Sequence, residues 1–362
     1  MSNFQLGLII AGAVVLIIVI AHNAWNSHRN APKRAQPPEG PASVMGEGGL
    51  RQEPGFDAQH LPAGQTDGFE GQRRDPADGL DLPAHPPERR GGLDALIDAI
   101  APIACEQPVA GEAALAALPP TRRAGSKPFA IEGLNQTTRA WEMPQAGQRY
   151  RQFQAGVQLA NRSGALNEIE FSEFVMKTQQ FADALSAAVD FPDMLHEVAR
   201  ARELDQFASE HDAQLTFVLR ARQAAWSTGY VQQHAARQGL VAGPIPGRMV
   251  LPASSAGLPP LLTLDYDPQA AMSDEPEQTA LYEITLSLDV AQVARSEQPF
   301  ARLRELAKGL CETMDGMLCD QNGTPLPAMA MDPIATDLEQ LYTQLDARDL
   351  SAGSALARRL FG

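Results

Sequence analysis

The chain has 362 residues, with 44 acidic and 29 Lys or Arg side chains and a formal net charge of -15. An acidic protein repels phosphate backbones, which bind through clustered Lys and Arg, so this charge argues against a nucleic-acid partner. The three cysteines are odd in number and form no Cys-x-x-Cys pair, which favours a reducing compartment over a disulfide framework.

An apolar stretch near the N-terminus predicts a membrane anchor. Residues 6–25 carry no charge, and Trp25 lies where an interfacial aromatic residue belongs. About 20 residues at 1.5 Å each cover the roughly 30 Å hydrocarbon core of a bilayer. The alternative is a cleaved signal peptide, which needs a basic segment before the apolar run and a small-x-small cleavage site after it. Because neither is convincing here, the anchor is the favoured interpretation.

Positive charge after the apolar stretch predicts the orientation of this anchor. Arg29, Lys33 and Arg34 all follow it, and no cationic side chain precedes it. Since Lys and Arg remain on the cytoplasmic side, residues 1–5 are predicted to be a short periplasmic N-terminus. The rest of the chain is then expected in the cytoplasm, held at the bacterial inner membrane by a single pass.

Residues 26–92 are predicted to be a disordered linker. Prolines and glycines make up about a third of residues 35–90, and no helical or alternating apolar period persists there. A flexible chain of this length has a root-mean-square span of roughly 40 Å. The segment therefore reads as a tether between the membrane and the folded part of the chain.

Residues 213–347 show the clearest order of secondary structure. Strands are predicted at 215–219, 240–251, 260–266, 281–290, 317–319 and 325–329, and helices at 228–237, 300–316 and 332–345. Asp320 to Gly323 carries an Asn-Gly turn signal, and Asp332 is the expected N-cap of the last helix. The prediction is an α+β sandwich with one antiparallel sheet and helices on one face, followed by a tail at 348–362.

Residues 93–212 also carry the periodicity of a folded region. Strands are expected at 96–105, 128–134, 140–143 and 151–160, and helices at 111–118, 168–188 and 194–210. This order echoes the later region, which gives two alternatives. One is a degenerate tandem repeat of the same α+β sandwich, and the other is an insertion packed on a single C-terminal domain.

The sequence contains none of the common phosphate-binding, nucleophile or zinc motifs. His211 and Asp212 end a predicted helix and are expected to be an exposed helix terminus rather than part of a metal site. We therefore predict no catalytic residues, no metal and no cofactor.

The short outside N-terminus, the single membrane helix, the Pro-rich tether and the order of strands together resemble the cell-division protein ZipA family. The resemblance covers residues 6–25 and 215–347, somewhat under half of the chain. It implies a split β-α-β domain that binds the C-terminal peptide of the tubulin-like protein FtsZ in a shallow cleft on its open sheet face. It also implies a location at the division septum.

Placed on this sequence residue by residue, the resemblance assigns eight residues to the peptide cleft. They come in pairs from four strands: Thr216 and Val218, Ile245 and Met249, Thr263 and Asp265, and Thr285 and Ser287. The implied function is an anchor that tethers and stabilises FtsZ filaments at the Z ring, with other division proteins as further partners. The alternative is an anchored enzyme or ligand sensor with a site between two α+β sandwiches.

Overall fold

The computed structural model of the chain describes residue 33, residues 92–275 and residues 278–362. All of these belong to one compact unit. The predicted N-terminus and anchor at residues 1–25, and the predicted linker at 26–92 apart from residues 33 and 92, lie outside the described residues. Within the described part of the chain, no helix is long and apolar enough to span a membrane.

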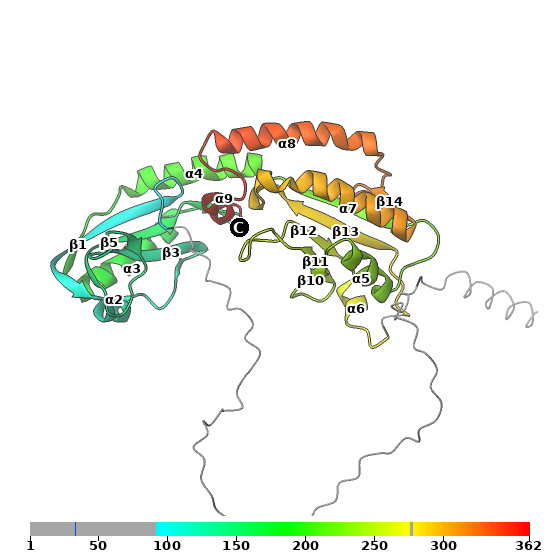
Figure 1. Ribbon diagram of the computed structural model, residues 1–362. Coiled ribbons are helices and arrows are strands. Elements are labelled where there is room, and N and C mark those ends of the chain that lie inside the picture. Colours follow the sequence, from blue (N-terminus) through cyan, green and yellow to red (C-terminus); the bar gives the residue numbers. More distant parts are fainter. Residues whose placement is uncertain (1–32, 34–91, 276–277) are drawn as a thin grey trace, which may run out of the picture. The chain divides into compact units, whose positions relative to one another are not determined.

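The first half of the described chain is an antiparallel sheet with helices (Figure 1). Its strands are β1 (Asp98–Ala110), β2 (Arg123–Ala124), β3 (Lys127–Asn135), β4 (Trp141–Glu142), β5 (Arg149–Gln158) and β8 (Ala187–Val189). Its helices are α2 (Gly111–Ala117), α3 (Glu168–Ala184) and α4 (Met194–His211), and β6 (Ala160–Asn161) pairs with β7 (Gly164–Ala165) in a separate hairpin. The sheet order is β2-β3-β5-β1-β8, with β4 beside β3.

Aromatic side chains join α3 to this sheet. Phe174 of α3 packs edge-to-face on Phe129, and Phe181 packs the same way on Phe153. The helix begins at a capping box, in which the side chain of Asn167 accepts backbone N–H bonds and Glu170 reaches back to it. Every second residue of β5 from Phe153 to Val157 is buried in this core, as period-2 patterning predicts.

The second half is a second antiparallel sheet with its own helices. Its strands are β9 (Gln214–Ala221), β10 (Val241–Ala242), β11 (Arg248–Leu251), β12 (Leu262–Asp265), β13 (Glu283–Asp289) and β14 (Gly316–Cys319). Its helices are α5 (Thr228–Arg237), α6 (Pro268–Ala271), α7 (Pro299–Met314), α8 (Met331–Asp346) and α9 (Ala355–Leu360), with short 3-10 turns η1 (Val290–Gln292), η2 (Arg295–Glu297) and η3 (Ala328–Ala330). The sheet order is β10-β11-β12-β13-β9-β14.

The two sheets share one strand order. When β1, β3, β5 and β8 are matched with β9, β12, β13 and β14, the first sheet reads β2-β3-β5-β1-β8 and the second β11-β12-β13-β9-β14. In each half the first strand is followed by a helix, α2 or α5, and a long helix, α3 or α7, precedes the last strand. The mixed α+β class with antiparallel sheets is therefore confirmed for both halves.

Helix α7 covers one face of the second sheet. Its predicted apolar stripe is confirmed, because Phe300, Leu303, Leu306, Leu310 and Met314 are all buried. Pro299 occupies the first helical turn, where its missing N–H costs nothing. The helix ends at Met314; Asp315 follows it in the left-handed conformation, and the chain turns directly into β14. The opposite face of the sheet is free of α5 and α7 (Figure 1).

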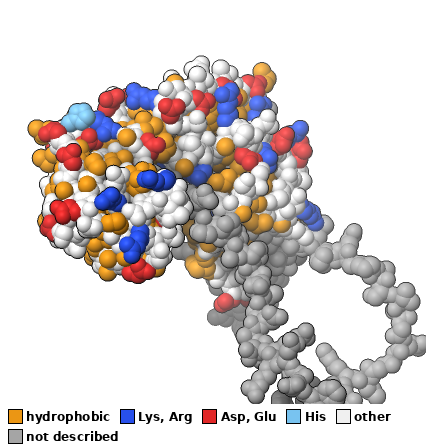
Figure 2. Space-filling model, turned by 60° about the vertical axis from the view of Figure 1, so that its left-hand side comes forward, with side chains coloured by type: hydrophobic (Ala, Val, Ile, Leu, Met, Phe, Trp, Pro, Cys, Tyr) orange, Lys and Arg blue, Asp and Glu red, His pale blue; other side chains and the backbone are white. Residues whose placement is uncertain are grey.

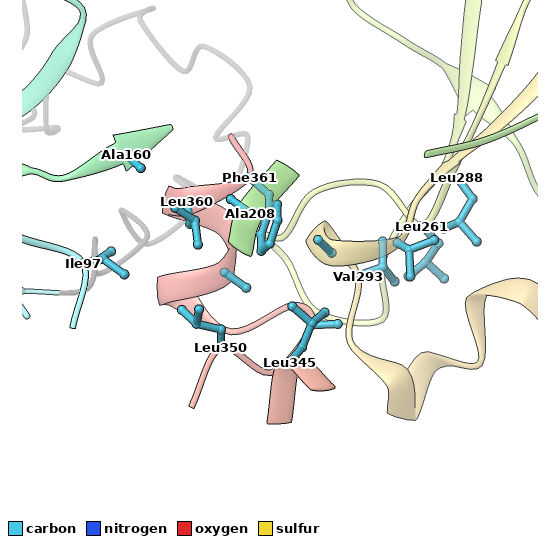
Figure 3. Packing of buried hydrophobic residues seen from close by; sticks show 14 of the residues in the cluster. Ile97, Ala160, Ala208, Leu261, Leu288, Val293, Leu345, Leu350, Leu360 and Phe361 are labelled. Atoms are coloured by element: carbon cyan, nitrogen blue, oxygen red, sulfur yellow. The ribbon is translucent and has the colours of Figure 1, made fainter. Parts of the chain in front are cut away.

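The C-terminal residues fold back as α9 instead of ending in a simple tail. Leu360 and Phe361 are fully buried, and both belong to a core cluster that includes Ile97 and Ala160 of the first half and Val293 of the second. Figure 3 shows this cluster from close by, with Leu360 and Phe361 near Ala208 of α4. The end of the chain thus contributes to the core of both halves.

Several local predictions were wrong. The predicted helix at 168–188 ends at Ala184 because the chain turns at Ser186, which has a positive φ, and then forms the edge strand β8. The predicted strand at 325–329 is one bridge between Cys319 and Pro325, followed by η3. Asp332 lies inside the first turn of α8 and is not its N-cap.

Charged residues of both signs are mixed on one face of the molecule. Figure 2 shows Lys and Arg side chains interspersed with Asp and Glu among hydrophobic side chains on the face that it presents. A surface of mixed charge leaves specificity to individual clefts rather than to a long-range field of one sign.

Candidate functional site

The open face of the second sheet carries six of the eight predicted cleft residues. Directly paired residues of an antiparallel sheet point to the same side. The register places Thr216 beside Ser287 and Ser287 beside Thr263, and in the next row Val218 beside Thr285 and Thr285 beside Asp265. All six side chains are half-buried. The two rows run across three strands and form one continuous, mainly hydroxyl-bearing surface.

A cavity of about 360 Å³ lies over this face. Four predicted residues line it: Thr216, Thr263, Asp265 and Ser287. Its wall comes from the loop between β11 and β12, which contributes Pro259, Pro260 and Leu261. The cavity therefore has a polar floor and an apolar wall, a combination that suits a bound segment with both backbone hydrogen bonds and apolar side chains.

An ion pair borders one part of the cavity. Arg248 of β11 donates from Nε to Oδ1 of Asp265 at 2.6 Å and from Nη2 to Oδ2 at 3.3 Å. The two residues are cross-strand partners, so the sheet itself aligns them. The hydrogen bond to Asp265 raises the pKa of Arg248. This planar pair is half-exposed and remains able to accept or donate further hydrogen bonds to a ligand.

A second charged group, Asp289 at the end of β13, also lines the cavity. Nη2 of Arg162, from the turn between β6 and β7, lies 2.7 Å from Oδ2 of Asp289 and 2.7 Å from Oδ1 of Asp212. Burial raises the pKa of Asp289, and the hydrogen bond from Arg162 offsets part of that rise. Arg162 thus brings the first half of the chain to the border of the cavity.

One oxygen of Asp289 is left without a hydrogen bond. Its Oδ1 atom is buried, and no described group bonds to it in hydrogen-bond geometry, although the backbone N–H of Gln292 is close enough to lower the pKa. Buried acceptors are usually satisfied in native proteins, so such an exception calls for an explanation. Because Oδ1 has no accessible surface, it is closed to a molecule in the cavity, and the backbone N–H of Gln292 is the donor that partly compensates this carboxylate.

The corresponding face of the first sheet is occupied by the chain itself. Leu93 packs against Gly156 of β5, where any larger residue would collide with the Leu93 side chain. The backbone N–H of Leu93 donates to Glu132 Oε1 at 3.1 Å, and Gln154 donates to Glu132 Oε2 at 2.8 Å. Of the two matched faces, the second sheet therefore offers the open one.

Two predicted cleft residues lie elsewhere. Met249 points to the opposite side of β11, where it pairs with Leu264 and is 5% exposed in the core. Ile245 is not in a strand at all; it lies in the loop before β11 and is 51% exposed. These two placements are corrections, because the prediction assigned both residues to the cleft face of one strand in the region 240–251, which glycines and prolines interrupt. Gly247, with a φ of 80°, turns the chain between them.

Sequence reasoning missed the charged residues of the cavity. Arg248 is the direct neighbour of Met249, and shifting the strand by one residue would have placed it opposite Asp265. His211 was expected at an exposed helix end, but it is buried and its Nδ1 hydrogen-bonds the carbonyl of Phe207 at 2.7 Å. No sequence signal connects Arg162 to Asp289, since their contact depends on the placement of a short hairpin.

Comparisons with known proteins give no family for this chain. No protein-family model matches it, and no curated protein does. Among solved structures, a chain titled "Structure of FgChi7B" is similar at 12% identity, covering 72% of this chain and 56% of that chain, with a TM-score of 0.18. The present chain thus spans about half the length of that structure, and a likeness this low carries no argument about fold or function.

Proposed function

We propose that the chain is a membrane-anchored adaptor of cell division whose second sheet binds the C-terminal peptide of FtsZ. The observation that carries the proposal is the open sheet face, with six predicted residues in two adjacent rows and a cavity lined by four of them. The described second half has the strand order and the single helix-covered face that a split β-α-β domain requires. The matching order of the first sheet favours the tandem alternative over an insertion.

The chemistry of the cavity specifies how a peptide would bind. The hydroxyls of Thr216, Thr263 and Ser287 offer hydrogen bonds to an extended backbone. The wall at Pro259 and Pro260 receives apolar side chains. A small polar cleft of this kind supports modest affinity for one peptide.

Modest affinity is sufficient for an adaptor that acts on a polymer. A filament presents many identical tails, and many anchored chains hold it together through multivalency without any new contact. The predicted single-pass helix would fix the chain in the inner membrane, with the sheets in the cytoplasm at the septum. In this account the protein tethers and stabilises FtsZ filaments at the Z ring, and other division proteins are further candidate partners.

A titration of the full chain in lipid nanodiscs with a fluorescent FtsZ C-terminal peptide tests the proposal. We expect the anisotropy of the peptide to rise to saturation. Val218→Glu and Thr285→Glu should each weaken the affinity for the peptide at least tenfold, or by about 1.4 kcal/mol. Gln152→Glu is the matched control, because it adds the same charge to β5, the counterpart of β13 in the first sheet. Absence of binding, or equal loss in the control, would contradict the proposal and favour the anchored ligand sensor.

A further inference from the structure

Lys33 pairs with the second half of the chain through its backbone. Its N–H donates to the carbonyl of Ala225 at 2.7 Å, and its carbonyl accepts from the N–H of Ser227 at 2.9 Å. These two bonds make a parallel β-bridge between Lys33 and Trp226. Lys33 therefore adds one extended residue to the edge of a segment almost 200 residues away in sequence.

The ammonium group of Lys33 has a matching site. Nζ donates to the carbonyl of Met314 at 3.1 Å and lies 3.5 Å from Oδ2 of Asp315. Met314 is the last residue of α7, and the carbonyl end of a helix attracts cations. The indole N–H of Trp226 donates to the same carbonyl at 2.9 Å. Helix end, carboxylate and indole together form a site for a lysine side chain.

The rest of the fold holds this site in place. Trp226 is completely buried, and its own N–H and carbonyl both bond to Leu281, each at 2.8 Å. Because Trp226 uses its own backbone groups on that side, the carbonyl of Ala225 and the N–H of Ser227 face the other side. Both bond to the backbone of Lys33, which is the arrangement that β-augmentation uses.

We propose that Ala225, Trp226, Ser227, Met314 and Asp315 form a docking slot for an extended, lysine-bearing segment, which the chain fills with its own Lys33. The predicted membrane helix ends near Trp25, about eight residues earlier, so the docked half lies within about 30 Å of the end of that helix. With Lys33 docked, residues 26–32 alone connect the predicted membrane helix to the second half, so the rest of the predicted linker does not lengthen the tether. The second sheet is thereby kept near the membrane. The docking itself is independent of FtsZ binding.

Hydrogen exchange on the full chain in nanodiscs tests the slot. The readout is the exchange rate of fragments that contain Ser227, whose amide bonds to the Lys33 carbonyl. Lys33→Pro removes the N–H that bonds to Ala225, and Lys33→Glu places a second negative charge beside Asp315. We expect each to speed exchange at Ser227 at least tenfold. Asp315→Asn should also speed it, since Asn tolerates the left-handed conformation of residue 315 and removes only the charge.

Arg34→Glu is the matched control for Lys33→Glu, because it makes the same change of net charge one residue further along the chain. It should leave exchange at Ser227 unchanged, and a synthetic peptide of residues 28–38 added to the Lys33→Pro chain should restore slow exchange. Unchanged exchange in Lys33→Pro, an equal effect of Arg34→Glu, or failure of the peptide to restore protection would each overturn the proposal. FtsZ-peptide affinity is measured separately, so either proposal can fail alone.

Discussion

Buried charged residues at the start of β3 show how polar groups are accommodated in this core. Lys127 is 1% exposed, and its Nζ donates to Ser126 Oγ at 2.9 Å and to Asn161 Oδ1 at 3.0 Å. Glu170 of α3 accepts from the backbone N–H of Ser126 at 2.8 Å and from its hydroxyl at 2.7 Å. The network joins β3, β6 and α3, so its polar groups hold three elements in register.

This network predicts a pH dependence of stability. Burial raises the pKa of Glu170, but hydrogen bonds from Ser126 and Asn167 outweigh it and lower the pKa below 4.5. A carboxyl whose pKa is lowered on folding stabilises the protein above its unfolded pKa, and this is lost as the pH falls through its folded pKa. Glu170→Gln should cost about 1–3 kcal/mol at neutral pH. Urea unfolding should show the difference shrinking below pH 4.5; a constant difference would contradict this account.

A second buried charge ties the C-terminus to the first sheet. Nη2 of Arg359 lies 2.5 Å from Oδ1 of Asp98, whose side chain is completely buried. Arg359→Ala leaves that carboxylate uncompensated and should cost about 3 kcal/mol in the free energy of unfolding. Adding Asp98→Asn should recover part of the loss, because it removes the unpaired charge. A loss in the double variant that equals the sum of the single losses would contradict coupling between the two residues.

At the scale of elements, the short helix α9 packs its C-terminal end into the core. Leu360→Ala should destabilise the chain by about 3 kcal/mol, because it leaves a cavity at a residue that is 0% exposed. Leu195→Ala in α4 is the matched control, since Leu195 is 68% exposed and its truncation should change little. Chemical denaturation of both variants measures the difference. Equal effects would mean that α9 does not pack as described.

At the scale of the whole molecule, the two halves are expected to unfold together. The α9 segment bonds to both, since Gln158 of β5 donates to the Arg359 carbonyl at 2.8 Å and Gly353 donates to the Ala291 carbonyl at 2.9 Å. Circular dichroism and tryptophan fluorescence should therefore report one coincident transition. Ending the chain after Leu350 should separate it into two. Two transitions in the intact chain would show that the halves are independent.

Most strands and helices follow from the periodicity of apolar residues. The open sheet face follows from the alternation of side chains between the two faces of a strand. Thr285 and Ser287 alternate with Ile284 and Leu286, so their side of the sheet is evident from sequence. This alternation cannot be followed across an interruption of the strand such as the turn at Gly247, which is why Met249 was assigned to the wrong side of β11. Contacts such as Arg162 with Asp289 depend on tertiary placement and leave no local pattern. The helix α9 is too short to produce one.

The most direct test of the central proposal is to map where the peptide lies. An FtsZ C-terminal peptide with a benzophenone side chain would be photo-cross-linked to the full chain in nanodiscs, and the linked residues identified by mass spectrometry. We predict cross-links within 259–265 and 287–289, the two segments that contribute most of the cavity lining, and their loss in Thr285→Glu. Cross-links confined to the first sheet, or to α7 and α8, would contradict the proposal that the open face of the second sheet binds the peptide.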